Sequence, residues 1–236
     1  MIWRVITYLW GFATALLTYV WMYWLNSTTV IGRKNLPRQS NCLLISNHLT
    51  LIDSWFIGVA CYFPWVFAKP WLIPWHLPEE KNYMDGQPLR LMCQLWRCIP
   101  VNRGSGDFWE KLPEINRSLQ EGNIIIFPEG TRSRKPKSGV LYRWNKGACV
   151  LAHENKATVI PVAIRGIEDI LPIGRTWPRF GRRVVIVVGE PIDGLDFLYN
   201  HDRKRAIPLI SDILQTRLQN TLNIANHVLA KKAPKG

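Results

Sequence analysis

The first segment that could do chemistry is Asn47-His48-Leu-Thr-Leu-Ile-Asp53, which follows a short apolar run. Histidine is the side chain that most often acts as a general base, and a nearby carboxylate can hold its imidazole in one tautomer. In a continuous helix, five residues advance about 500°, which would leave the two side chains roughly 140° apart. His48 and Asp53 can therefore meet only if His48 lies in a turn before a helix and Asp53 lies in its first turn.

The same residues also have a purely structural interpretation. Thr50 fits the N-cap of a helix and Asp53 its N3 position, which together make a T-x-x-D capping box. In that case Asp53 only caps the helix and His48 is a buried, hydrogen-bonded histidine. This segment taken alone favours the structural interpretation.

The second segment lies downstream of another apolar run, Asn123–Phe127, and reads Pro128-Glu129-Gly130-Thr131-Arg132-Ser133-Arg134. Glycine, hydroxyl groups and two guanidinium groups offer the donors that bind a phosphate. By itself this segment favours a solvated basic loop over a phosphate site. Two weaker patterns accompany it: Ile99–Arg103, an apolar run ending in an arginine, and Val159–Val162, a strand-like run containing a proline.

In this order and spacing, the segments resemble the glycerolipid acyltransferases, specifically the 1-acylglycerol-3-phosphate (lysophosphatidate) acyltransferases. The resemblance extends from about Val30 to Val188 and rests on a set of matching blocks: Val30–Pro37, Asn47 with His48 and Asp53, Phe127–Ser133, Lys146-Gly147 and Val159–Val162. Two positions depart from the family pattern. Arg97 stands where glycine is frequent, which bears on the shape of the acceptor pocket, and Thr50 stands where serine is frequent.

The resemblance implies acyl transfer from a thioester without a covalent enzyme intermediate. His48 would act as general base on an acceptor hydroxyl, and Asp53 would orient the imidazole. A second group would hold the acceptor's phosphate: Arg103, Glu129, Gly130, Thr131 and Arg132. Glu129 would orient the arginines or bond a glycerol hydroxyl, since a carboxylate repels a phosphate. The implied donor is acyl-CoA or acyl-carrier protein, and the implied acceptor is a lysophospholipid, foremost lysophosphatidate; no cofactor or metal is implied. The alternatives are the same fold acting on another lysolipid or as a phospholipid transacylase, or a non-catalytic basic protein that binds membranes.

The segments that carry these residues alternate between strand-like and helix-like patterns. Apolar runs of strand length occur at 42–46, 123–127, 158–164 and 184–188, and helical patterns occur at 108–120, 141–155 and 207–229. This alternation predicts an α/β fold with a mostly parallel central sheet flanked by helices. Catalytic residues at strand ends are typical of such folds.

The N-terminal segment predicts a membrane helix. No charged residue occurs from Val5 through Gly32, and a bilayer span needs about 20 apolar residues. A monotopic anchor is the alternative, whereas a signal peptide fits poorly because the apolar run is long and aromatic. Arg33, Lys34 and Arg38 follow the segment, which places the rest of the chain on the cytoplasmic side. The predicted division is an anchor at 1–29, a catalytic domain at 30–230 and a basic tail at 231–236.

Trp55–Leu77 carries one charge, Lys69, and is interrupted by Pro64, Pro70 and Pro74. Proline at this density excludes a regular spanning helix. We consider two interpretations equally: a buried helix followed by a loop along the core, or an apolar surface that dips into lipid or lines an acyl-chain groove.

Composition narrows the class of protein further. An apolar fraction of 47% excludes a disordered chain, and a net charge of +13 predicts anionic partners. Membrane lipids, coenzyme A phosphates and an acidic carrier protein fit this charge; a nucleic acid does not, because the basic residues cluster behind Phe127–Gly130. The five cysteines lie in apolar runs and are expected to be reduced. The chain has no G-x-S-x-G motif of a serine lipase, and Cys149 with His153 lacks a third group.

Overall fold

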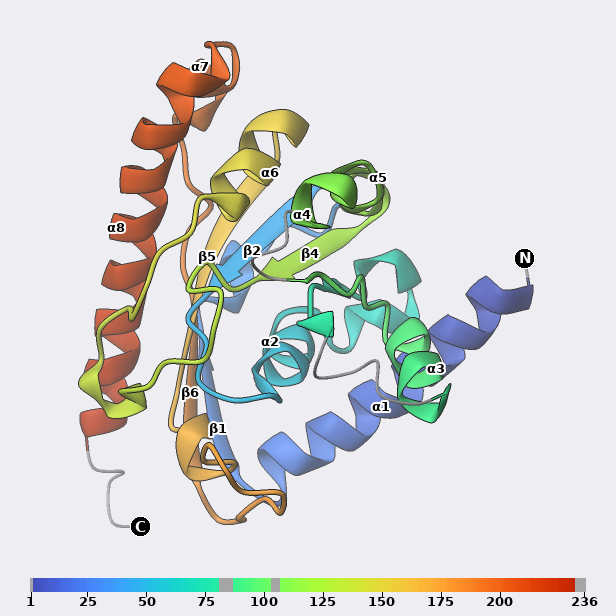
Figure 1. The fold of residues 1–236 in the computed structure, drawn as a ribbon. Coiled ribbons are helices and arrows are strands. Elements are labelled where there is room, and N and C mark those ends of the chain that lie inside the picture. The colour runs from blue at the N-terminus through green and yellow to red at the C-terminus, as the bar shows by residue number, and fades with distance from the viewer. Residues whose placement is uncertain (1, 81–86, 103–106, 232–236) are drawn as a thin grey trace.

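The structure is a computed structural model that describes residues 2–80, 87–102 and 107–231 (Figure 1). The described residues form a six-stranded sheet in the order β1-β6-β5-β2-β4-β3. The strands are β1 (Ser27–Ile31), β2 (Cys42–Ser46), β3 (Trp75–His76), β4 (Asn123–Ile126), β5 (Thr158–Arg165) and β6 (Arg183–Val188). All neighbouring strands pair in parallel except β5 and β6, which are antiparallel. The predicted α/β fold with a mostly parallel sheet is therefore confirmed.

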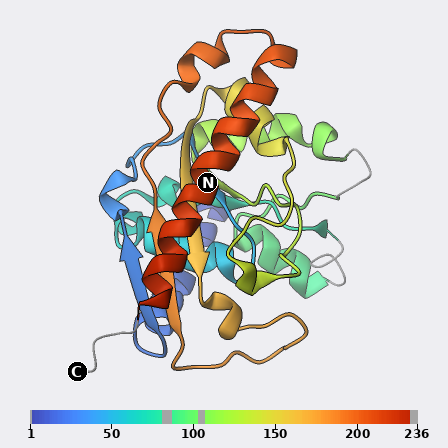
Figure 2. The same ribbon diagram turned by 90° about the vertical axis from the view of Figure 1, so that its left-hand side faces the viewer.

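Both faces of the sheet are buried, as β2 illustrates. Cys42 and Leu44 face one apolar core, whereas Leu43 and Ile45 face the other. The first core is covered by α1 (Ile2–Tyr23) and α2 (Asp53–Tyr62). The second is covered by α5 (Leu112–Glu121), α6 (Gly147–Asn155), α7 (Leu195–Tyr199) and α8 (Arg203–Ala230). Figure 2 shows α8 lying across the strands that it contacts, β5 and β6.

Two helical predictions need correction. The segment 108–120 forms two helices, α4 (Asp107–Glu110) and α5, because Pro113 begins a new helix and cannot bond a carbonyl in the preceding one. The helix predicted over 141–155 begins only at Gly147. The amides of Leu141, Tyr142 and Asn145 bond instead to Gln219, Glu129 and Pro128, so they are not available to a helix.

The sequence patterns did not predict β1 and β3. The predicted ends of several other elements differ slightly from the ends in the structure. β4 ends at Ile126, β5 extends to Arg165, β6 begins at Arg183, and α8 spans Arg203–Ala230. Between α2 and β4 lies α3 (Gln87–Leu95).

All five cysteines are free and four are buried; burial raises the pKa of Cys42 and of Cys61 to about 12.

The N-terminal helix α1 is the helix among the described residues that is long and apolar enough to cross a membrane. Thr7, Gly11, Thr18 and Met22 are buried on its inner face, and Phe12 and Tyr19 also pack against the core there. Its outer face exposes large apolar side chains: Ile2, Trp3, Val5, Ile6, Leu9, Leu16 and Leu17. A helix that is apolar on its exposed face as well as its buried one suits a lipid environment.

β1 begins at Ser27 and pairs with β6, so one strand lies on both sides of the predicted boundary at residue 30. The division into anchor, domain and tail stays a prediction. Residues 232–236 of the predicted tail lie outside the described residues.

The segment 55–77 has a buried part and an exposed apolar part, and its contact with lipid or an acyl chain stays a prediction. Phe56, Ile57, Tyr62 and Leu72 belong to the core. Trp65, Phe67 and Trp71, by contrast, are exposed to between 38% and 51%. Between these two groups, other side chains of the segment line a narrow apolar cavity beneath α1, described below.

Candidate active site

His48 and Asp53 are in direct contact. β2 ends at Ser46, the chain turns, and α2 begins at Asp53, which brings the carboxylate under the imidazole. The distance from His48 Nδ1 to Asp53 Oδ2 is 3.0 Å. The imidazole also stacks on Phe127, with ring centroids 4.2 Å apart and an interplanar angle of 15°. The ring is thus fixed on one edge and one face.

Asp53 is fully buried and surrounded by donors from the same turn. Its carboxylate accepts hydrogen bonds from the amides of Leu49 and Thr50 and from the Thr50 hydroxyl. The predicted capping box is only half formed. Asp53 bonds the Thr50 amide, but Thr50 Oγ1 accepts from the amide of Ile52, and the helix starts at Asp53 itself. A carboxylate at the first helical residue reaches His48, which a residue one turn inside the helix would not.

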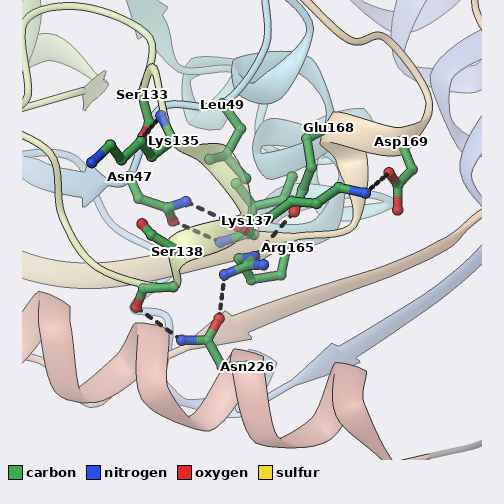
Figure 3. Close-up of polar contacts among 12 residues, drawn as sticks. Asn47, Leu49, Ser133, Lys135, Lys137, Ser138, Arg165, Glu168, Asp169 and Asn226 are labelled. Carbon is green, nitrogen blue, oxygen red and sulfur yellow. Dashed lines mark hydrogen bonds and ion pairs between the residues drawn. The ribbon is translucent and has the colours of Figure 1, made fainter.

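Neighbouring residues tie this turn to the sheet. The Asn47 side chain exchanges two hydrogen bonds of 2.9 Å with the backbone of Ile164 in β5. The carbonyl of His48 accepts from the Ser133 amide at 2.8 Å. Figure 3 shows Asn47 and Ser133 beside a second polar group, in which Arg165 bonds Glu168 and Asn226. Burial of Glu168 raises its pKa.

Glu129 lies against the backbone of the His48 turn. One carboxylate oxygen accepts from the His48 amide at 2.8 Å and the other from the Tyr142 amide at 2.8 Å. The side chain is 1% exposed, and this burial raises its pKa to about 7. Glu129 therefore connects two loops through their backbones.

Gly130 follows in a left-handed conformation, with φ of 66°. A Cβ atom at this position would lie 2.5 Å from Asn145 Nδ2. The backbone angle favours glycine here, and a larger residue would also displace the Asn145 side chain.

The loop 127–146 also contacts α8, and side chains of that helix, distant in sequence, hold it in place. Gln219 accepts from the Leu141 amide and donates to the Gly139 carbonyl. Trp144 donates to Ser211 at 2.9 Å. The loop that carries the proposed phosphate donors is therefore positioned by the C-terminal helix.

His48, Gly130, Thr131 and Arg132 line a common pocket of about 400 Å³. Asp53 lies beneath His48. Glu129 does not line this pocket but lines a neighbouring cavity of about 690 Å³, which shares Phe127 and Gly130 with it. Arg103, the remaining predicted site residue, lies outside the described residues. The structure thus brings four of the predicted residues together around one cavity, and the carboxylates of Asp53 and Glu129 bond to the His48 turn.

A second, narrow cavity of about 60 Å³ lies beneath α1. Its walls are almost entirely apolar, and two residues, Ser54 and His76, line both cavities. Burial and the nearby charge of Arg97 lower the pKa of His76 to about 4.

Sequence patterns did not identify Ser54 and His76. Ser54 directly follows Asp53, so its position beside the catalytic candidates was available from the sequence. His76 lies in an apolar segment, and only its place in β3, next to β4, brings it to the site.

Arg97 does not line the pocket. It has φ of 53°, in the left-handed region where glycine is favoured, and its guanidinium donates to the Ile73 carbonyl and stacks on Trp75 at 4.4 Å. Its departure from the family pattern therefore affects the packing beneath β3 and not the wall of the pocket.

Known proteins resemble the chain in sequence and in fold. The family model described as "Acyltransferase" matches residues 27–165. The chain is 24% identical over 234 residues to tafazzin of Drosophila melanogaster and 26% identical over 163 residues to N-acylphosphatidylethanolamine synthase of Arabidopsis thaliana. These matches cover 90% and 64% of the chain, but only 60% and 55% of the two relatives' lengths.

A 1-acyl-sn-glycerol-3-phosphate acyltransferase of Borreliella burgdorferi is 24% identical over 200 residues, covering 83% of the chain and 74% of that protein. The crystal structure of the 1-acyl-sn-glycerophosphate acyltransferase PlsC from Thermotoga maritima has a similar fold. It superposes with a TM-score of 0.66 at 18% identity, covering 98% of this chain and 81% of that one.

Proposed function

The chain belongs to the acyltransferase family, and from this premise we propose that it moves a fatty acyl group from a thioester to a lysophospholipid. The proposed acceptor is 1-acylglycerol-3-phosphate, which would give phosphatidate, and the proposed donor is acyl-CoA or acyl-carrier protein. The observation that carries the proposal is the His48–Asp53 pair at the wall of a pocket that also contains Arg132.

In the proposed reaction, His48 Nε2 takes the proton of the acceptor hydroxyl as its oxygen attacks the thioester carbonyl. The C–S bond then breaks, and the thiolate takes the proton back from the imidazolium. Asp53 accepts the hydrogen bond of Nδ1–H, which presents Nε2 as the base and stabilises the imidazolium. Such a base contributes typically about 10²–10⁴-fold to the rate.

The acceptor's phosphate is proposed to bind at Gly130, Thr131 and Arg132, with Arg103 as a further candidate. Glu129 is proposed to act as a positioning residue, because both of its oxygens are occupied by backbone amides of the His48 turn and the Tyr142 loop. Glu129 is therefore not proposed to contact the substrate directly. A carboxylate turned away from the pocket also avoids repelling the phosphate.

The acyl chain of the thioester is proposed to enter the apolar cavity beneath α1. The thioester carbonyl would then lie near Ser54 and His76, which line both cavities. Gly11, Thr14, Ala15 and Thr18 form the α1 side of this cavity. Small residues leave a slot between helices that a hydrocarbon chain can fill.

The outer face of α1 is proposed to attach the protein to a membrane, with the catalytic domain on the cytoplasmic face. Exposed apolar side chains along α1 and the cationic residues 33, 34 and 38 that follow it support this proposal. The net charge of +13 suits anionic leaflet lipids and both proposed acyl donors.

The test is to incubate purified full-length protein with radiolabelled acyl-CoA or acyl-carrier protein and a panel of acceptors, then identify the labelled lipid. Lysophosphatidate should be acylated most rapidly. The panel includes other lysolipids, phosphatidylethanolamine, and labelled phospholipid as an alternative donor, because related proteins carry the names tafazzin and N-acylphosphatidylethanolamine synthase. Preferential labelling of another acceptor, or transfer from phospholipid alone, would reject the lysophosphatidate assignment.

A further inference from the structure

The loop between β5 and β6 exposes large apolar side chains that the proposed reaction does not use. Ile173 is 50% exposed, Trp177 79% and Phe180 56%. Next to the base of this loop, at the end of α1, Trp24 is 79% exposed and Leu25 46%. These five residues are called the loop patch below. An apolar surface of this kind usually marks an interaction site.

The loop patch is fixed to the end of α1 by hydrogen bonds. The Gly181 amide donates to the Leu25 carbonyl at 2.8 Å, and the Ser27 amide donates to the Arg182 carbonyl at 2.9 Å. The buried Asn26 side chain donates to the Trp21 carbonyl and accepts from the Arg182 amide. Figure 1 shows the loop beside the end of α1 and far from α7. The position of the loop is therefore coupled to that of the candidate membrane helix.

The charge around the loop patch has one sign. Between Asp169 and Glu190 the chain has no acidic residue, and it contains Arg175, Arg179, Arg182 and Arg183. Arg183 bonds carbonyls at the end of α8, whereas the first three arginines are exposed. Among the described residues these three form no ion pair. Aromatic side chains interleaved with free guanidinium groups suit the interface of an anionic bilayer.

We propose that the loop patch inserts into the head-group region of an anionic phospholipid bilayer, as a second membrane contact beside α1. The arginines that accompany it and its hydrogen-bonded link to the end of α1 favour a bilayer as the occupant over a protein partner. The proposal rests on the proposed membrane attachment of α1. Two contacts at separate places would fix the orientation of the domain, and hence of the pocket at His48, relative to the lipid surface.

The test uses a solvatochromic probe on single cysteines of the full-length protein in vesicles of phosphatidylcholine with phosphatidylglycerol. Trp177→Cys reports on the loop patch, Leu9→Cys on the outer face of α1, and Phe197→Cys, 68% exposed on α7, on a site away from both. Labelling of the wild-type chain sets the background, since its cysteines are buried or half-buried. Emission is measured with quenchers either dissolved in water or carried on lipid.

The probe at 177 should shift to the blue and be quenched by the lipid-borne quencher, like the probe at Leu9, whereas the probe at 197 should be quenched from water. A water-quenched probe at 177 beside a lipid-quenched probe at 9 would overturn the loop proposal and leave the attachment by α1 standing. Water quenching at both positions would reject both proposals.

Charge is tested by changing Arg175, Arg179 and Arg182 together to Gln. The probe at 177 should then lose most of its preference for anionic over neutral vesicles, by up to roughly 100-fold in partition, because each guanidinium near such a surface is worth about fivefold. The control changes the exposed residues Lys204, Arg205 and Arg217 of α8 to Gln and should have little effect. Equal partition of the loop variant and the control would contradict the role of the arginines.

Discussion

The His48 turn (47–53) and the loop 127–146 together form the candidate site, but they are held in place in different ways. The donors around Asp53 all come from within five residues of it. The loop, by contrast, reaches His48 through Glu129 across 81 residues and α8 through Gln219 across 78 residues. The His48–Asp53 pair is thus held mainly by local hydrogen bonds, although Asn47 and the His48 backbone also bond to remote segments. The loop depends on remote partners throughout. Substitutions should therefore separate chemistry in the turn from positioning by the loop.

The largest effect is expected from His48→Ala, because it removes the proposed base. The rate with lysophosphatidate should fall by about 10²–10⁴-fold, while thermal unfolding and donor KM change little. Asp53→Asn should also be severe. The control is His227→Ala, since His227 is exposed at the end of α8. If His48→Ala kept half of the wild-type rate, the turn would not contain the base.

Glu129→Gln tests whether the loop is coupled to the turn through a buried carboxylate. Burial raises the pKa of Glu129 from 4.5 to about 7, so in this range the folded state holds a proton that the unfolded state has released. The free energy of unfolding should therefore fall as pH rises from about 4.5 to 7 and then level off, by up to roughly 3 kcal/mol at about 1.4 kcal/mol per unit.

Chemical denaturation of wild type and Glu129→Gln across this pH range gives the difference between their profiles. The free energy of unfolding of the wild type should fall across this range by the predicted amount, and that of the variant should not, because Gln does not titrate. Parallel profiles would mean that Glu129 does not carry a raised pKa. A kcat loss in Glu129→Gln without a change in donor KM would further support a positioning role.

Arg132→Ala tests the loop as the phosphate site. The acceptor KM should rise by roughly 10–100-fold, which corresponds to the loss of one charge-assisted contact of about 1.5–3 kcal/mol, and the donor KM should stay nearly constant. Arg134→Ala is the matched control, because Arg134 is exposed and does not line the pocket. Equal acceptor KM values in the two variants would place the phosphate elsewhere.

The smallest effect is expected at the far end of the loop. Gln219→Ala removes the hydrogen bonds to Gly139 and Leu141 and should lower the free energy of unfolding by about 1 kcal/mol. The acceptor KM should rise modestly, since the loop loses one attachment. Gln215→Ala, an exposed position one turn earlier on α8, should leave both quantities unchanged. An unchanged stability of Gln219→Ala would show that α8 does not position the loop.

The sequence alone was enough to predict the local part of the site and the fold class. The contact of His48 with Asp53 follows from the spacing and from a turn before a helix, because every partner lies nearby in the chain. The buried strands of β2, β4, β5 and β6 could be found from their apolar runs, because burial on both faces leaves a continuous pattern. The order of the motifs likewise indicated the family.

Only the tertiary structure decided the features that depend on distant partners. The helix predicted from residue 141 begins at Gly147 because Glu129 and Gln219 take the amides of Tyr142 and Leu141. His76 reaches the pocket through a two-residue strand that has no sequence pattern. Glu129 turned out to hold the backbone of His48, 81 residues away. Periodicity and propensity report on neighbours in the chain, whereas these hydrogen bonds form only after the sheet and α8 have brought remote segments together.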